Sequence, residues 1–339
     1  MTFKYFNFYL TIIFSLFFFT NIALTNNIKN SAIVFMYHKF DVNKYPSTNI
    51  TLQQFNSHIK EFSLDKYNIL PLDYIVDTII NDGNLPENTI GLSVDDADKS
   101  FLTLAWPILK AKKFPVTLFI NTNSIGNKNY LSWDEIRFLK NEGVLIGSHS
   151  HNHYHLADMS KEDIIKEIET SNKIFLREIG EIPSLFAYPY GEADEKIIKI
   201  LEKYKFKVAF GQHSGVINET SNLYYLPRFS LNERYGNIDR VKFAANTRGL
   251  GVYDFIPTNP HIYENPPFIG FSLLDQGLVK SLDCFIFDSQ GQVESEIFKF
   301  NERIEIRLSR VLTNGRSRLN CTAKDKLGNW RWFGHQFIL

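Results

Sequence analysis

The first two thirds of the chain alternate short apolar runs with longer segments of helical period, and this alternation limits the possible folds more than any other feature. Strands that alternate with helices along a chain are typical of an α/β domain with a mostly parallel sheet. Strands are predicted at Ile33–Met36, Ile90–Val94, Val116–Ile120, Val144–Gly147, Leu185–Ala187, Lys207–Phe210 and Tyr224–Leu226. Helices are predicted at Thr51–Phe62, Leu72–Ile80, Ser100–Lys112, Ser132–Asn141, Lys161–Ile179 and Ala193–Tyr204. About six or seven strand–helix units predict a distorted (β/α) barrel that is complete or nearly so.

The pattern changes after Gly251. Four prolines fall between residues 257 and 267 without any periodicity, which favours a linker over 251–267 between a barrel domain at 31–250 and a second domain. Six strand-like runs follow, separated by Gly, Asn and Asp, and they predict a β-sandwich over 268–339. Two cysteines of this sandwich lie on predicted strands, and they either form a disulfide or stay as two buried thiols. These are Cys284 and Cys321.

The start of the chain has the pattern of a targeting segment. Residues 6–24 are almost entirely apolar, Lys4 precedes them, and polar residues follow directly. This order indicates a signal peptide. About 20 apolar residues also suffice to cross a bilayer, so an uncleaved membrane anchor is the alternative for residues 1–25. Both interpretations predict export to the periplasm or the extracellular space.

The charge balance and the cysteine content exclude several classes of protein. The chain has 37 Lys and Arg against 37 Asp and Glu, a formal net charge of zero. Proteins that bind nucleic acid in general carry an excess of basic residues, so nucleic acid is not an expected partner. Two Cys are too few for a disulfide framework or for a Cys-rich zinc module. Any metal ion must therefore be held by His and carboxylate groups.

A dense group of His residues follows one of the predicted strands. Four of the nine His lie within seven positions, directly after Val144–Gly147, and they are His149, His151, His153 and His155. His is the commonest metal ligand in proteins, so this density favours a metal site over core packing. Alternate residues of an extended segment share one face. The spacing alone therefore does not say which of the four His bind.

Two adjacent carboxylates, Asp95 and Asp96, follow the strand predicted at Ile90–Val94. Barrels of this class place their active sites at the C-terminal ends of strands, which favours a chemical role over capping of the next helix. One carboxylate with two imidazoles is a usual ligand set for catalytic zinc. Such a metal activates water and polarises a carbonyl, while a second carboxylate takes the proton of the water. The pattern predicts a metal-assisted hydrolase acting on an amide or an ester.

Three segments resemble, in order and spacing, the motifs of the NodB-type polysaccharide deacetylases. They are Ser93–Ala97, His149–His153 and Phe186–Gly191, where the family has T-F-D-D-G, H-[ST]-x-x-H and R-x-P-Y. The resemblance covers about residues 31 to 230. It implies the barrel fold of that family and the removal of acetyl groups from a polysaccharide.

The resemblance also implies roles for individual residues. Asp95 is similar to the catalytic base, and Asp96, His149 and His153 are similar to the metal ligands. The backbone N–H of Tyr190 is similar to the donor that stabilises an oxyanion. By the same resemblance, His151 and His155 are expected to bind no metal. Substrate contacts are expected from Tyr188 and Pro189 in the third motif. By their position in the chain, His213, which follows a predicted strand, and Arg228 are further candidates for substrate contact, and a turn residue or a surface ion pair is the alternative for each.

The sequence departs from the family pattern at three places. Ala187 stands where many members have the Arg that orients the base, Ala97 replaces a Gly, and no downstream Leu-x-His element supplies the usual general acid. Arg228 is a candidate replacement for the missing Arg beside Asp95. Phe35–His38 resembles the branch of poly-N-acetylglucosamine deacetylases found in biofilm systems, and this makes His38 the candidate acid.

The sequence thus predicts an exported hydrolase that depends on a divalent metal, most favourably Zn²⁺. Its expected substrate is an acetylated polysaccharide, such as a poly-N-acetylglucosamine-like or chitin-like glycan from which it removes N-acetyl groups. Two alternatives remain at this point. One is an O-acetyl esterase acting on an ester-bearing glycan, and the other is a catalytically inactive carbohydrate-binding relative. The sequence leaves the identity of the glycan and the oligomeric state open.

Overall fold

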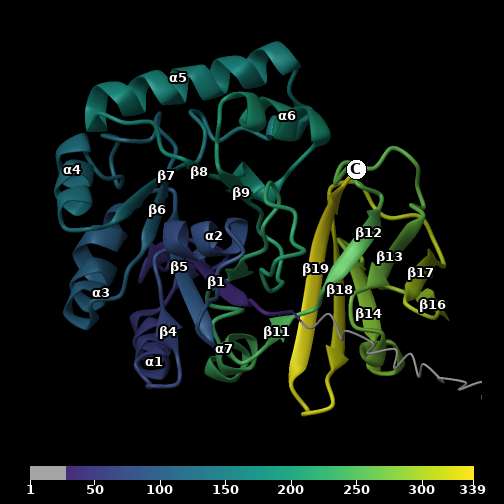
Figure 1. Ribbon diagram of the computed structural model, residues 1–339. Coiled ribbons are helices and arrows are strands. Elements are labelled where there is room, and N and C mark those ends of the chain that lie inside the picture. The colour runs from purple at the N-terminus through teal and green to yellow at the C-terminus, as the bar shows by residue number, and fades with distance from the viewer. Residues whose placement is uncertain (1–27) are drawn as a thin grey trace, which may run out of the picture.

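The computed structural model describes residues 28–339 (Figure 1). The segment predicted as a signal peptide or anchor, 1–25, lies outside the described residues. Within 28–339, none of the helices is long and apolar enough to cross a membrane.

Eight parallel strands form the sheet of the larger part of the described structure. They are β1 (Ala32–Tyr37), β4 (Asn68–Ile69), β5 (Thr89–Asp95), β6 (Thr117–Ile120), β7 (Leu145–Ser148), β8 (Leu185–Ala187), β9 (Val208–Phe210) and β10 (Phe229–Ser230). Their order is β10-β1-β5-β6-β7-β8-β9, with β4 paired to β5. This confirms the predicted distorted (β/α) barrel. Over the described residues β9 and β10 do not pair, so the sheet stays open between them. Next to this gap, a single bridge joins Phe210 of β9 to Leu226, which precedes β10. The strand predicted at Tyr224–Leu226 is therefore reduced to that bridge.

In the described part of the chain, seven α-helices surround this sheet, and the ends of several carry the expected caps (Figure 1). They are α1 (Leu52–Phe62), α2 (Leu72–Ile80), α3 (Trp106–Lys112), α4 (Trp133–Asn141), α5 (Lys161–Ile179), α6 (Glu195–Lys203) and α7 (Ile238–Ala245). Thr51 and Ser132 begin α1 and α4 with capping boxes. The helix predicted at Ser100–Lys112 begins as a π-helix at Phe101–Ala105 and continues as α3. Helix α7 was not predicted, because its eight residues give too short a periodic pattern.

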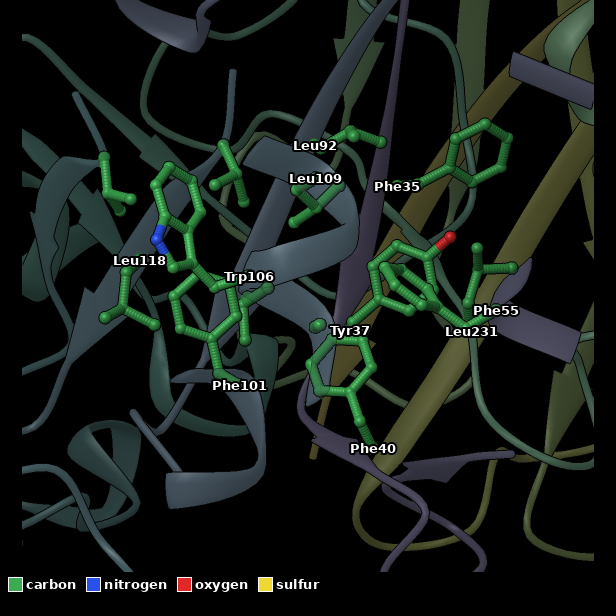
Figure 2. Packing of buried hydrophobic residues seen from close by; sticks show 14 of the residues in the cluster. Phe35, Tyr37, Phe40, Phe55, Leu92, Phe101, Trp106, Leu109, Leu118 and Leu231 are labelled. Carbon is green, nitrogen blue, oxygen red and sulfur yellow. The ribbon is translucent and has the colours of Figure 1, made fainter. Parts of the chain in front are cut away.

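Aromatic side chains fill the space between β1 and α1, as Figure 2 shows. Tyr37 meets Phe55 edge-on with ring centroids 5.4 Å apart, and Phe40 meets the same ring at 4.9 Å. Such contacts contribute beyond the area that they bury. They fix the end of β1 and the short strands β2 (Lys39–Phe40) and β3 (Asn49–Ile50) that follow. The side chain of His38 is thereby held at the mouth of the barrel.

The C-terminal region consists of two sheets that share one core, as the sandwich prediction requires. The four-stranded sheet contains β12 (Val252–Ile256), β13 (Ile269–Leu273), β16 (Ser295–Phe300) and β17 (Arg303–Leu308). The five-stranded sheet contains β11 (Arg248–Gly249), β14 (Asp283–Asp288), β15 (Gly291–Val293), β18 (Arg316–Lys324) and β19 (Trp330–Ile338). Cys284 and Cys321 face each other on β14 and β18 and form a disulfide. The prediction of a linker over 251–267 is wrong for the first part of that segment, because β12 lies there and pairs with β13.

The five-stranded sheet packs against the barrel (Figure 1). Trp332 of β19 meets Phe229 edge-on, with ring centroids 5.1 Å apart, and also contacts Phe243 of α7. Gly334, on the same strand, lies so close to the carbonyl of Ser214 that no side chain fits there. The barrel and the sandwich therefore share a close interface, and this interface borders the site described next.

Candidate metal centre and active site

The three predicted metal ligands come together at the C-terminal end of the parallel sheet. Asp96, His149 and His153 each offer one ligand atom, and these atoms lie within 4.8 Å of one another. The Nε2 atoms of His149 and His153 are 3.7 and 3.5 Å from Oδ1 of Asp96. The structure thus brings together the three residues that the resemblance implied.

Turns in the backbone select these two His from the four. Ser150 and His153 have left-handed φ angles of 65° and 60°, so the segment after β7 is folded rather than extended. His151 turns away, and its Nδ1 lies 2.8 Å from the hydroxyl of Thr122. His155 pairs with Glu192 at 2.7 Å. The extended geometry considered from the sequence would have placed all four on one face, and the two turns prevent this.

The polar atoms of this group fit a divalent metal ion. Nδ1 of His149 lies 2.7 Å from the carbonyl oxygen of Ala187, which assigns the ring proton to Nδ1 and leaves the lone pair of Nε2 facing Asp96. Nε2 of His149 and Oδ1 of Asp96 are both buried without a hydrogen-bond partner among the described residues. Buried polar atoms of a native protein are normally paired. A cation between these atoms satisfies both of them.

Asp95, the predicted base, is fully buried and forms an ion pair with Arg228 that is also fully buried. Two guanidinium nitrogens donate to the two carboxylate oxygens over 2.7 and 2.9 Å, and Nε donates to the carbonyl of Gly211 over 2.9 Å. Burial raises the pKa of Asp95, but the charge of Arg228 and its hydrogen bonds to the carboxylate oppose this and bring the pKa down to about 2. The carboxylate is therefore ionised and held in one orientation.

Arg228 thus stands beside Asp95, as the sequence suggested for the place left by Ala187. The prediction that Arg228 also contacts substrate is wrong, because its guanidinium is enclosed between Asp95 and the rings of Phe119 and Phe210.

The other predicted substrate contacts are wrong for the same reason. Tyr188 is fully buried, and its hydroxyl donates to the carbonyl of Tyr224. Pro189 is buried, and His213 packs against Tyr225 with only 2% of its surface exposed. The sequence places these residues near a strand end but does not say which way their side chains point.

Tyr190 and His38, in contrast, reach the open cleft. Tyr190 has a left-handed φ of 58°, and its ring lies 4.6 Å from that of His153 and stacks on His155 at 3.7 Å. The sandwich holds this loop, since Arg316 donates to the carbonyl of Tyr190 and Gln336 donates to that of Gly191. Burial lowers the pKa of His38, and the charges of the two Asp residues partly oppose this.

The cleft over the metal ligands has a volume of about 820 Å³ and lies between the barrel and the sandwich. The barrel contributes His38, Asp96, His153, Tyr190, Asn232, Arg234, Tyr235 and Arg240 among others, and the sandwich contributes Phe287, Asp288, Arg316, Arg318 and Asn320. Sequence reasoning missed the sandwich wall. The signal was present in β18, where every second residue from Arg316 to Asn320 is polar and faces the cleft, while the residues between them are buried.

Comparison with known proteins finds similarity within the barrel. The sequence model of the polysaccharide deacetylase family matches residues 82–209. A poly-β-1,6-N-acetyl-D-glucosamine N-deacetylase of Staphylococcus aureus is 25% identical over an alignment of 221 positions, which covers 61% of this chain and 75% of that protein. Proteins with this name are hydrolases.

Solved structures agree with the fold. The Streptococcus pyogenes deacetylase PplD superposes with a TM-score of 0.59 at 18% identity, covering 64% of this chain and 99% of that one. IcaB from Ammonifex degensii superposes with a TM-score of 0.56 at 20% identity, covering 64% and 97%. About a third of this chain lies outside each match. Residues 82–209 therefore match the polysaccharide deacetylase family in sequence, and the barrel has the fold of these solved deacetylases.

Proposed function

We propose that this protein is a metal-dependent deacetylase that removes N-acetyl groups from a polysaccharide, with a poly-N-acetylglucosamine-like glycan as its substrate class. The observation that carries the proposal is the arrangement of Asp96, His149 and His153 beside the buried pair of Asp95 and Arg228. The matched relatives, whose name states this activity, support it. The inactive alternative was prompted by the missing Arg and by the absence of the late His element. The position of Arg228 beside Asp95 removes the first reason, and the proposed role of His38 answers the second.

Each residue of the site has a part in the proposed hydrolysis. A divalent metal, most favourably Zn²⁺, lowers the pKa of water and polarises the acetyl carbonyl when it is bound by Asp96, His149 and His153. Asp95 takes the proton of the attacking water, and Arg228 orients Asp95 and keeps it ionised. The N–H of Tyr190 donates to the developing oxyanion. His38 gives a proton to the leaving nitrogen, which departs as the amine of the sugar.

We also propose that the protein is exported and acts outside the cytoplasm. The apolar N-terminal segment supports export. The disulfide between Cys284 and Cys321 is a second supporting observation, because such bonds persist mainly in oxidising compartments.

The experiment that tests the proposed function is acetate release by the zinc-loaded protein, residues 28–339, from poly-β-1,6-N-acetylglucosamine oligomers. Acetate and free amine are expected in equal amounts. Acetate without amine from an O-acetylated oligomer, and no acetate from the N-acetylated one, would make the protein an esterase. A metal-loaded protein that releases neither contradicts the proposal.

Removal of a metal ligand is expected to abolish metal binding and activity together. Asp96→Ala and His153→Ala should each lower the bound metal, measured by elemental analysis, from about one ion per chain to a small fraction of that value. His151→Ala is the matched control, since His151 contacts Thr122 rather than the metal group. Full metal content in Asp96→Ala would show that the ligands are other residues.

His38→Gln is expected to lower kcat about 10²-fold with unchanged metal content, because general acid catalysis typically contributes a factor of this order. His38 is buried but borders the cleft, and Gln keeps a polar side chain of similar size there, so stability should change little. Kinetics of acetate release at saturating substrate measure the effect. A kcat within about 3-fold of the wild type would remove His38 from the proton transfer.

A further inference from the structure

The cleft over the metal group has one strongly basic side, to which the barrel and the sandwich contribute equally. Its arginines, among the described residues, are Arg234 and Arg240 from the barrel, and Arg316 and Arg318 from β18. Figure 1 shows β18 and β19 on the side of the sandwich that faces the barrel. We call these four residues the arginine wall.

Carboxylates of the protein do not neutralise this wall. Within residues 28–339, no carboxylate oxygen lies within 4.0 Å of a guanidinium nitrogen of Arg234, Arg240 or Arg318, and Arg316 has only Glu192 at 3.7 Å. Over the same residues, the cleft itself contains two carboxylates, and both are engaged. Asp96 belongs to the metal group, and Asp288 is paired with Arg310 over 2.6 and 3.0 Å.

The wall is also held in place. Arg240 donates to the carbonyls of Ser230 and Tyr235 and lies over the rings of Phe229 and Tyr235. Partial enclosure lowers the pKa of Arg318, and the charge of Arg316, two residues away on the same face of β18, lowers it further.

We propose that the polysaccharide substrate of this site carries anionic groups close to the acetylated sugar, and that the arginine wall binds their carboxylate or phosphate oxygens. Guanidinium groups match both kinds of anion with paired hydrogen bonds. This inference rests on the proposed function for the identity of the reacting group.

Binding measured by calorimetry tests the inference separately from catalysis. The zinc-loaded Asp95→Asn protein is titrated with three oligosaccharides of equal length. These are a neutral N-acetylglucosamine hexamer, a hyaluronan hexasaccharide that carries carboxylates, and a phosphorylated N-acetylglucosamine hexamer. At about 20 mM salt, at least one anionic oligosaccharide is expected to bind at least about 10-fold more tightly than the neutral one, and the difference should shrink at about 200 mM salt. The tighter of the two anionic ligands identifies the group that is recognised.

Arg318→Gln, in the same Asp95→Asn protein, is expected to weaken anionic binding about 5-fold and to leave neutral binding unchanged. Arg307→Gln is the matched control, because Arg307 is an exposed arginine of β17, in the other sheet, and lies outside the cleft. The common background cancels any effect of the change at position 95. Equal binding of neutral and anionic oligosaccharides, or equal effects of the two Arg variants, would overturn the inference. Salt-dependent anionic binding without acetate release from any of the three by the wild type would instead reject the proposed function and leave the charge recognition standing.

Discussion

Asp95→Asn is expected to lower kcat for acetate release by about 10³-fold or more while one metal ion per chain stays bound. The substitution removes the basic carboxylate but keeps its size, and the amide that replaces it still offers one oxygen to Arg228. Positioned general bases typically contribute factors of about 10² to 10⁴. The substitution leaves the ligands Asp96, His149 and His153 unchanged, so the metal content should stay the same while the activity falls. Acetate kinetics and elemental analysis of the same sample measure the two quantities.

Asp98→Asn provides the matched control, because it makes the same change three residues away. Asp98 is buried, and one of its oxygens accepts hydrogen bonds from the N–H and the hydroxyl of Ser100. It has no place in the proposed chemistry, and Asn can accept the same bonds. A kcat within about 2-fold of the wild type is expected. Retained activity in Asp95→Asn, or an equal loss in both variants, would contradict the assignment of Asp95 as the base.

The fold was largely predictable from the sequence because its signals are local. Alternation of apolar runs and helical period placed most strands of the barrel close to their observed positions, and Ser160 marked the start of α5. The failures occurred where local signals are weak. Helix α7 has eight residues, and β12 follows a glycine and precedes a proline-rich stretch, so it resembled a linker.

The site was predictable only in part, because half of it depends on contacts between distant segments. Asp95, Asp96 and the His group are visible in short motifs, and their ligand set followed from a resemblance. The pairing of Arg228 with Asp95 joins residues 133 positions apart and has no motif. The substrate side was predicted poorly, because burial decides which residues of a loop meet the cleft. Tyr188 and His213 are buried, while Arg318 of the second domain faces the cleft.

The second large effect is expected from Arg228→Met, which should destabilise the protein by about 3–5 kcal/mol. Met fills much of the volume of Arg but leaves the carboxylate of Asp95 buried without its partner, and an unpaired buried charge is strongly unfavourable. Urea unfolding, followed by circular dichroism, gives the free energy of unfolding. A decrease of less than about 1 kcal/mol in the free energy of unfolding would show that Asp95 does not need Arg228 to neutralise a buried charge.

The double variant separates loss of the pair from loss of packing. In Asp95→Asn/Arg228→Met both charges are absent, so the double variant should be more stable than Arg228→Met by about 1–3 kcal/mol, although it carries one more substitution. If Arg228 acted only through packing against Phe119 and Phe210, the second substitution would add its own cost instead. The same double variant should be as inactive as Asp95→Asn. Arg228 is thus expected to act on the reaction only through the carboxylate that it holds, and a further loss of kcat in the double variant would assign it a separate contact with the substrate.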